Sequence, residues 1–228
     1  VSVECSGKMD LKLWFEPYNQ EGGMEPTEVG IRFFADAFEM LHCDQKCGVH
    51  LEGALKVVTD GETESDESGL WIRKCTNVQI YLAMETDFEN KDLSDRCMHQ
   101  IAFARCISAV QKGAAEVIRR HEEDMKQFTE GTRLEIEGTD SVSGKIPLMF
   151  QYGRYLLFCS SREDSKLPAH LQGIWNDNVA CRIGWTCDMH LDINTQMNYW
   201  PAEFSGMGFV AEPLYRWIEE KLIPEGRK

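Results

Sequence analysis

The chain has 228 residues, of which 43% are hydrophobic and 27% charged, a composition typical of a soluble globular protein with a core of its own. Its formal net charge of -14 argues against nucleic acid or an anionic membrane surface as a partner, and no apolar run approaches the length of a membrane span. A neutral or basic ligand suits this charge better.

Nine cysteines are spread along the chain without the spacing of a disulfide framework. A chain of this size does not need disulfides for stability, so the cysteines favour a reducing cytoplasm. The first residue is Val1, and no charged and apolar leader precedes the body of the chain. We therefore expect the chain to begin inside a longer protein, with secretion as the alternative to a cytoplasmic location.

The segment from Gly30 to Phe88 predicts β-strands separated by polar turns. It contains three runs rich in β-branched and aromatic residues, "GIRFFADAFEM", "VHLEGALKVV" and "GLWIRKCTNVQIYLAM". The acidic stretch "TDGETESDESG" between the last two predicts a turn or loop, and the pair Gly22 and Gly23 predicts a turn. No spacer is long enough for a crossover helix, so we expect an antiparallel sheet.

After Met98 the apolar residues recur at three- and four-residue spacing, which predicts helices. We expect one helix over Met98–Phe128, then a turn-rich linker, then a helix over Ile146–Ser161 with Pro147 in its first turn. The predicted buried face of this second helix consists of Leu148, Tyr152, Tyr155, Leu156 and Cys159.

Two further helices are predicted, over Asn194–Tyr199, ending before Pro201, and over Glu212–Leu222. The last one carries an apolar face of Leu214, Trp217, Ile218 and Leu222. A sheet region followed only by helices predicts an α+β protein of more than one domain. The predicted boundaries are a β domain over residues 1–94, a linker with a long helix over 95–145, and a helical domain over 146–228.

The run "HCDQKCGVH", His42–His50, contains two cysteines and two histidines, the side chains that bind zinc. Its spacing matches no zinc finger or ribbon, and a turn between strands with buried thiols is the simpler interpretation. The sequence also has no phosphate loop, no dinucleotide fingerprint and no serine nucleophile elbow. We therefore predict neither a metal nor a cofactor.

The segment from Leu167 to Glu203 places amides and carboxylates among tryptophans. Its stretch "CDMHLDINTQMNYWPAE" has His190, Asp192 and Asn194 at every second position, which gives the three side chains one direction in an extended segment. Aromatic rings cover the C–H face of a sugar and polar groups hold its hydroxyls, so the mixture favours a carbohydrate pocket. Buried, hydrogen-bonded amides in a tryptophan-rich core are the alternative for any single residue. The cluster also includes Gln172, Trp175, Asn176, Trp185, Asn198, Tyr199 and Trp200.

The chain contains, in order, "LMFQYGRYLLFCSSR", "LPAHLQGIWND", "HLDINTQMNYWPAE" and "EPLYRWIEE". This succession resembles glycoside hydrolase family 95, whose members are inverting exo-glycosidases, chiefly α-L-fucosidases with some α-L-galactosidases. The resemblance is strong from Phe150 to Lys228 and looser from Gly30 to Phe88. It implies a glycan substrate and a fold that joins a β-sandwich-like domain, a helical linker and an (α/α)6 barrel with the active site.

In that family a His-x-Asn-x-Asn run lies in the sugar pocket, and it falls on His190, Asp192 and Asn194. The resemblance implies that His190 binds a sugar hydroxyl and that Asn194 positions the attacking water. We also predict Asn176 and Trp185 as substrate-binding residues. Asp192 departs from the family pattern, because a carboxylate only accepts hydrogen bonds whereas an amide also donates. It could orient the water more strongly or share its proton, so we predict it as catalytic with Asn194.

The resemblance places a general-acid Glu and an Asp after Lys228, because the residues beyond Lys145 are too few for a barrel that needs roughly 200. We expect an internal part of an enzyme that releases terminal α-L-fucosyl or α-L-galactosyl residues, inactive when alone. A non-catalytic carbohydrate-binding or scaffold protein that retains the pocket wall is the alternative.

Overall fold

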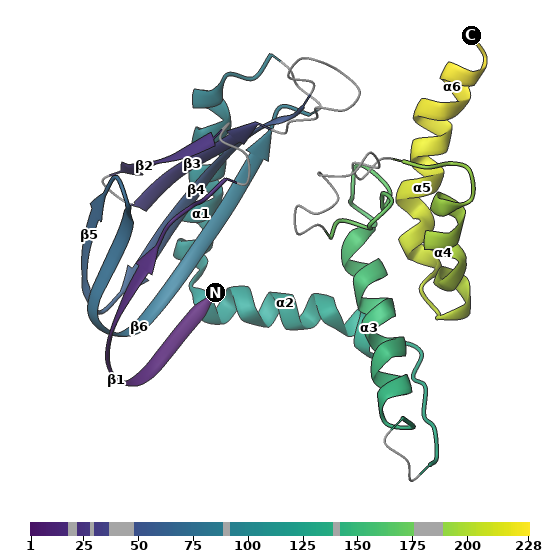
Figure 1. Ribbon diagram of the computed structural model, residues 1–228, viewed down its shortest axis with the longest axis horizontal. Helices are drawn as coiled ribbons and strands as arrows, with labels where there is room; N and C mark the ends of the chain where they lie inside the picture. Colours follow the sequence, from purple (N-terminus) through teal and green to yellow (C-terminus); the bar gives the residue numbers. More distant parts are fainter. Residues whose placement is uncertain (18–21, 28–29, 37–47, 89–91, 139–141, 176–188) are drawn as a thin grey trace. The chain divides into compact units, whose positions relative to one another are not determined.

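The computed structural model describes residues 1–17, 22–27, 30–36, 48–88, 92–138, 142–175 and 189–228. They form two compact units, Val1–His121 and Glu122–Lys228, each with its own apolar core (Figure 1). An antiparallel sheet plus helices makes the chain an α+β protein. Among the described residues, no helix combines the length and the apolar character needed to cross a membrane.

Within the described ranges, six strands of the first unit form one antiparallel sheet (Figure 1). The strands are β1 (Ser2–Leu13), β2 (Gly22–Thr27), β3 (Gly30–Asp36), β4 (His50–Thr59), β5 (Glu62–Asp66) and β6 (Gly69–Thr86). Their order is β1-β6-β4-β3-β2, and β5 pairs with the first residues of β6. The antiparallel pairing that the short connections predict is confirmed.

Two strands lie where the sequence predicts a loop or a turn. β5 occupies the acidic stretch, and all its side chains are exposed because only its backbone pairs with β6. The glycines Gly22 and Gly23 begin β2 and do not form an isolated turn. Both predictions were wrong for the same reason: a strand at a sheet edge needs backbone partners, not an apolar pattern.

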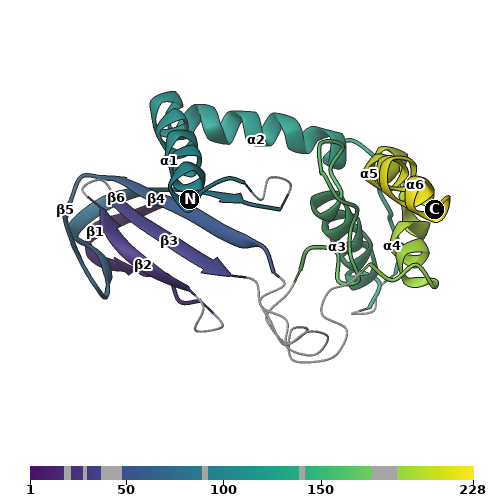
Figure 2. The same cartoon turned by 90° about the horizontal axis from the view of Figure 1, so that it is seen from above.

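Helix α1 (Asp95–Lys112) covers one face of this sheet (Figure 2). Ala54 of β4 and Tyr81 of β6 lie under the helix, against Ala102 and Cys106. The next residue along β4, Leu55, points to the opposite face, as strand alternation requires. There it packs on a second group of buried side chains, Ile31, Leu70, Ile72, Cys75 and Val78.

A break at Gly113 divides the single helix that the sequence predicts over Met98–Phe128. Gly113 has a φ of 80°, and its N–H bonds to the carbonyl oxygens of Ala109 (3.2 Å) and Val110 (3.0 Å). This left-handed conformation ends α1, and glycine adopts it without strain. The next helix, α2 (Ala114–Thr129), begins at the following residue.

A network of charged side chains lies between β3, β4 and the start of α1. Arg32 donates to both carboxylate oxygens of the fully buried Glu52, at 2.8 Å and 2.5 Å. His50 contacts Asp36 through Nδ1 (2.6 Å), Glu52 through Nε2 (3.3 Å), and Asp95 through Nε2 (3.8 Å). Burial of the imidazole disfavours its charged form, but the hydrogen bonds to Asp36 and Glu52 outweigh burial and raise the pKa of His50.

In the second unit, helices pack around an apolar cluster. The elements that follow α2 are α3 (Lys145–Ser160), α4 (Asn194–Phe204), the 3₁₀ helix η2 (Gly208–Ala211), α5 (Glu212–Trp217), the π turn η3 (Ile218–Leu222) and α6 (Ile223–Gly226). The buried residues of the cluster are Phe128, Leu157, Phe158, Ala169, Tyr199, Ala202, Met207, Val210 and Ala211.

Two helix ends differ from the predicted ones. α4 continues through Pro201 to Phe204, although proline has no N–H to donate to the carbonyl four residues earlier. The predicted stop before Pro201 was therefore wrong. The last helical stretch runs past the predicted end at Leu222 to Gly226, through the π turn η3.

The buried face of helix α3 differs from the predicted one. Leu148, Tyr152 and Tyr155 are 68%, 53% and 37% exposed, whereas Arg154 is 3% exposed. The side chains that α3 buries are Arg154, Leu157, Phe158 and Ser160. Hydropathy alone places the arginine outside, so the prediction was wrong about this face.

Hydrogen bonds explain why Arg154 lies inside. Its guanidinium donates to the carbonyl oxygens of Thr132 (2.8 Å), Ser205 (3.2 Å) and Phe128 (3.3 Å). A buried guanidinium needs such partners, and here they come from the ends of two other helices. The apolar neighbours Leu157 and Phe158 then share its side of the helix.

We expect the stability of the first unit to fall as pH rises through the titration of His50. Because the folded-state pKa is raised, the stabilising contribution of the imidazolium is complete below the ordinary value of 6.5 and is lost as pH rises through the raised value. His50→Gln should remove this loss, which urea denaturation at a series of pH values would show. The exposed His121, changed to Gln, is the matched control and should keep the original profile. An identical profile in His50→Gln would contradict the role of this network.

Candidate functional site

Three of the predicted site residues lie at the N-terminal end of α4. His190 precedes a turn over residues 191–193, Asp192 lies within that turn, and Asn194 is the first helical residue. His190 and Asn194 are half-buried and Asp192 is exposed. Asn176 and Trp185 fall outside the described residues.

The predicted extended arrangement of His190, Asp192 and Asn194 was wrong. The N–H and the hydroxyl of Thr195 both donate to the carbonyl oxygen of His190, at 2.9 Å and 2.8 Å. These two bonds bring residues five apart together and close the backbone into a turn. The three side chains therefore share one helix end and not one face of a strand.

Ile193 holds a strained conformation at the start of α4. Its φ is 77°, in the left-handed region that a β-branched side chain rarely adopts. Such strain costs about 1–3 kcal/mol and is concentrated at ligand-binding sites. Ile193 also occupies the N-cap position, where no side chain caps the helix. Asp192 is therefore not the cap, and its carboxylate lies exposed at the positive end of the α4 dipole.

Buried hydroxyl groups fasten α4 to the segment that follows α3. Ser161 Oγ donates to the carbonyl oxygen of Val210 (2.8 Å) and lies 2.7 Å from the hydroxyl of Tyr199. Because Ser161 has one hydroxyl hydrogen, the Tyr199 O–H is the donor in their contact. The Tyr199 oxygen accepts from the Ala169 N–H (2.8 Å). Burial raises the pKa of Tyr199. This tyrosine is therefore part of the core, in agreement with the alternative interpretation of the cluster as buried, hydrogen-bonded side chains.

Asn198 also belongs to the framework of the site. Its Nδ2 donates to the carbonyl oxygen of His170 (2.7 Å). Two backbone hydrogen bonds join His170 to Gly173. Gly173 has a φ of 70°, and a Cβ atom at this position would lie only 2.6 Å from Ser160 Oγ, so the position requires glycine. Burial lowers the pKa of His170, and its Nδ1 accepts from the Gln172 N–H (3.2 Å), which fits a neutral ring. The loop before residue 176 is thus tied to α4.

Two tryptophan rings, one in this loop and one on α4, are exposed, whereas a polar atom of the same loop is buried. Trp175 is 42% exposed, stacks on Tyr155 with 6.4 Å between ring centroids, and donates from Nε1 to the carbonyl oxygen of Leu156 (3.3 Å). Trp200 is 58% exposed. In the part of the chain that the structure describes, the buried Oε1 of Gln172 has no hydrogen-bond partner. A buried acceptor without a donor costs about 1–3 kcal/mol.

One group of side chains in the first unit has the residue types of a metal site. Single ligand atoms of His50, Glu52 and Asp95 lie within 4.8 Å of one another. Arg32 already binds both oxygens of Glu52, and its positive charge opposes a second cation beside it. Residues 42–47, the larger part of the run considered for zinc, lie outside the described ranges.

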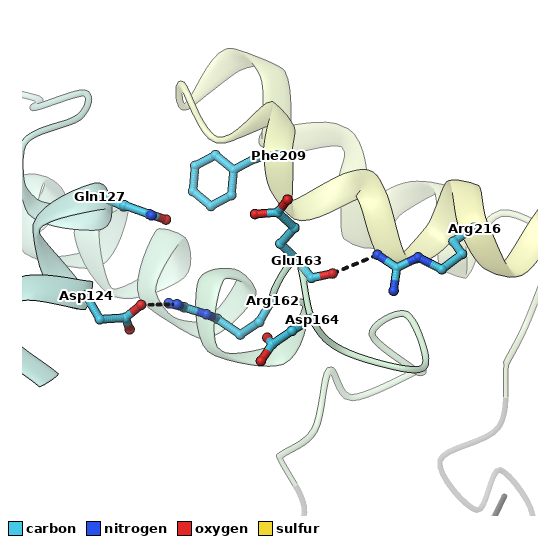
Figure 3. Close-up of a pocket in the computed structure, with 7 residues that line it drawn as sticks. All are labelled: Asp124, Gln127, Arg162, Glu163, Asp164, Phe209 and Arg216. Carbon is cyan, nitrogen blue, oxygen red and sulfur yellow. Dashed lines mark hydrogen bonds and ion pairs between the residues drawn. The ribbon is translucent and has the colours of Figure 1, made fainter. Parts of the chain in front are cut away.

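A cavity of the second unit lies beside the segment that follows α3 (Figure 3). Its volume is about 450 Å³. The lining residues are Asp124, Gln127, Arg162, Glu163, Asp164, Phe209 and Arg216. Sequence reasoning missed this cavity because its residues come from four segments that share no motif.

A family model described as "Glycosyl hydrolase family 95 catalytic domain" matches residues 99–228, more than half of the chain. "Probable alpha-fucosidase A" of Aspergillus niger is 43% identical over 79 residues, which cover 35% of this chain and 10% of that protein. "Alpha-L-fucosidase 2" of Arabidopsis thaliana is 29% identical over 219 residues, which cover 81% of this chain and 25% of that protein. The chain thus spans only a tenth to a quarter of the length of these relatives.

We expect Tyr199→Phe to destabilise the second unit by about 1–3 kcal/mol, because the buried N–H of Ala169 would lose its acceptor and the Ser161 hydroxyl would lose the donor it accepts from. Urea denaturation measures the change in the free energy of unfolding. Tyr152→Phe is the matched control, since Tyr152 is 53% exposed, and it should leave this free energy unchanged. Equal stability of the two variants would show that the buried hydroxyl does not hold α4 in place.

Proposed function

The chain belongs to glycoside hydrolase family 95, and from this membership we propose that its polypeptide hydrolyses terminal α-L-fucosyl residues of glycans. The observation that carries the proposal is the match of the catalytic-domain model over residues 99–228. The fucosidase names of both relatives support it. In this proposal α3 to α6 are the first helices of an (α/α)6 barrel, and the sheet unit belongs to the β domain that precedes it.

We assign the water side of an inverting reaction to the N-terminal end of α4. An inverting glycosidase holds an acid on one side of the glycosidic bond and activates a water on the other, with about 6.5–9.5 Å between the two groups. The Asn194 amide can orient this water, and the Asp192 carboxylate can accept a hydrogen bond from it. The positive end of the α4 dipole favours the negative charge that develops as the water loses its proton.

The sugar itself would contact the groups around this water. His190, half-buried before the turn, is the proposed partner of a sugar hydroxyl, and Asn176 and Trp185 are further proposed substrate contacts. The exposed ring of Trp175 offers a face for the C–H surface of the sugar. The general acid would come from a part of the polypeptide after Lys228.

The stereochemistry of hydrolysis tests this function. A polypeptide that contains this chain at the length of its relatives should cleave an aryl α-L-fucoside, and proton NMR should show the β-anomer of fucose first, because inversion converts the α-linkage. An aryl α-L-galactoside assayed in parallel reports the second sugar specificity. Initial release of the α-anomer, or no hydrolysis of either substrate, would refute the proposal.

The carboxylate of Asp192 gives a second test in the same polypeptide. Asp192→Asn restores the amide of the family pattern, but it removes an acceptor that could take up the proton of the water. If Asp192 acts on the water, turnover of the aryl fucoside should fall by about 100-fold or more, since general acid–base groups contribute about 10²–10⁴-fold. Glu212→Gln, an exposed carboxylate in the first turn of α5, is the control and should keep full turnover. Full turnover in Asp192→Asn would assign the water to Asn194 alone.

A further inference from the structure

The cavity of Figure 3 has the features of a binding site, and none of its residues belongs to the turn that carries Asp192. Gln127 comes from α2, Arg162 and Glu163 from the turn after α3, and Phe209 from η2, and they surround one opening (Figure 3). Its volume of about 450 Å³ lies within the range of small-molecule sites.

Backbone hydrogen bonds fix the turn that forms one wall of the cavity. The Ser165 N–H donates to the carbonyl oxygen of Arg162 (2.8 Å), and the Arg162 N–H donates to Ser165 Oγ (2.9 Å). Arg216 of α5 donates to the carbonyl oxygens of Glu163 (2.7 Å) and Ser165 (3.4 Å). The carboxylates of Glu163 and Asp164 therefore project from a constrained backbone.

Aromatic contacts fix the rest of the wall. The guanidinium of Arg162 lies over the ring of the buried Phe158, 4.1 Å from its centroid, and pairs with Asp124 (Figure 3). Phe209 packs edge-on against the same ring, with 6.1 Å between centroids. Both groups are held by the protein before any ligand arrives, which lowers the entropy lost on binding.

Several polar groups of the cavity keep hydrogen-bonding capacity. Within the described ranges, no hydrogen bond or ion pair engages the side chains of Gln127, Glu163 and Asp164. The charges nearly balance, because three carboxylates face two guanidinium groups. A phosphate would be repelled by the carboxylates, and an ammonium group would gain little attraction, because only one carboxylate is in excess and both guanidinium groups lie nearby. A neutral polyol needs no net charge, since each hydroxyl donates and accepts.

We propose that this cavity is a second saccharide-binding site, at which the chain holds a neutral part of its glycan. Phe209 covers the C–H face of a sugar ring, and Gln127, Glu163 and Asp164 bind its hydroxyl groups. The chemical class of the ligand rests on the proposed function, whereas the position of the site rests on the residues of the cavity alone.

NMR titration of the ¹⁵N-labelled 228-residue chain tests the site, with fucosyllactose, inorganic phosphate and spermidine as separate probes. Only the trisaccharide should shift the backbone amides of residues 162–164 and 209 and the side-chain amide of Gln127. Gln127→Ala and Glu163→Ala should each weaken its binding by about tenfold, the loss expected for one hydrogen bond.

Two exposed residues of the same types serve as controls, Gln111→Ala and Glu122→Ala, and both should leave the dissociation constant unchanged. No shift with the trisaccharide, or shifts with phosphate or spermidine alone, overturns the inference. Trisaccharide shifts confined to residues 190–194 overturn it as well. Binding at the cavity without hydrolysis by the longer polypeptide would refute the proposed function only, and hydrolysis without binding here would refute this inference only.

Discussion

One buried guanidinium group connects the ends of two helices, and the order of the second unit depends on it. A helix leaves its last carbonyl oxygens without partners, at the negative end of its dipole. Arg154 of α3 donates to one such oxygen of α2, that of Phe128, to that of Thr132 three residues after α2, and to that of Ser205 directly after α4. Burial lowers the pKa of Arg154, but an arginine keeps its charge, and these carbonyl dipoles stabilise it. α2, α3 and α4 therefore pack as a set.

The same arrangement supports the proposed site at the start of α4. Arg154 holds the segment at the end of the helix, and the buried hydroxyl of Tyr199 holds its middle against Ser161 and Ala169. The start of α4, with the strained Ile193 at its N-cap, is where we propose that the ligand binds. A site works when its reacting groups are held by a rigid supporting shell, and here buried hydrogen bonds supply that shell.

Sequence patterns were sufficient wherever a local property decides the outcome. Enrichment in β-branched and aromatic residues located β4 and β6, because such side chains pack well on the pleated surface of a sheet. Spacings of three and four residues located the helical segments after residue 95. The order of the motifs between Phe150 and Lys228 identified the family, since residue type and order over such a stretch do not recur by chance. The charged network of β3 and β4 also had a signal in the sequence. Polar residues stand an even number of positions apart along the two paired strands, Arg32 and Asp36 on β3 and His50 and Glu52 on β4. The prediction of two ordinary strands overlooked this pattern.

Hydrogen-bond partners far apart in the sequence decided the structural features that these local patterns did not predict. Leu148 is as apolar as Leu157, which α3 buries, and the helix turns Leu148 outward because Arg154 finds carbonyl oxygens 22 to 51 residues away. The turn before α4 is set by bonds from Thr195 to His190, which no period-two pattern contains. The cavity beside Phe209 needs four separate segments. Hydropathy reports what each side chain would gain from burial, whereas the buried polar groups of this protein are placed by the particular donors and acceptors that folding brings to them.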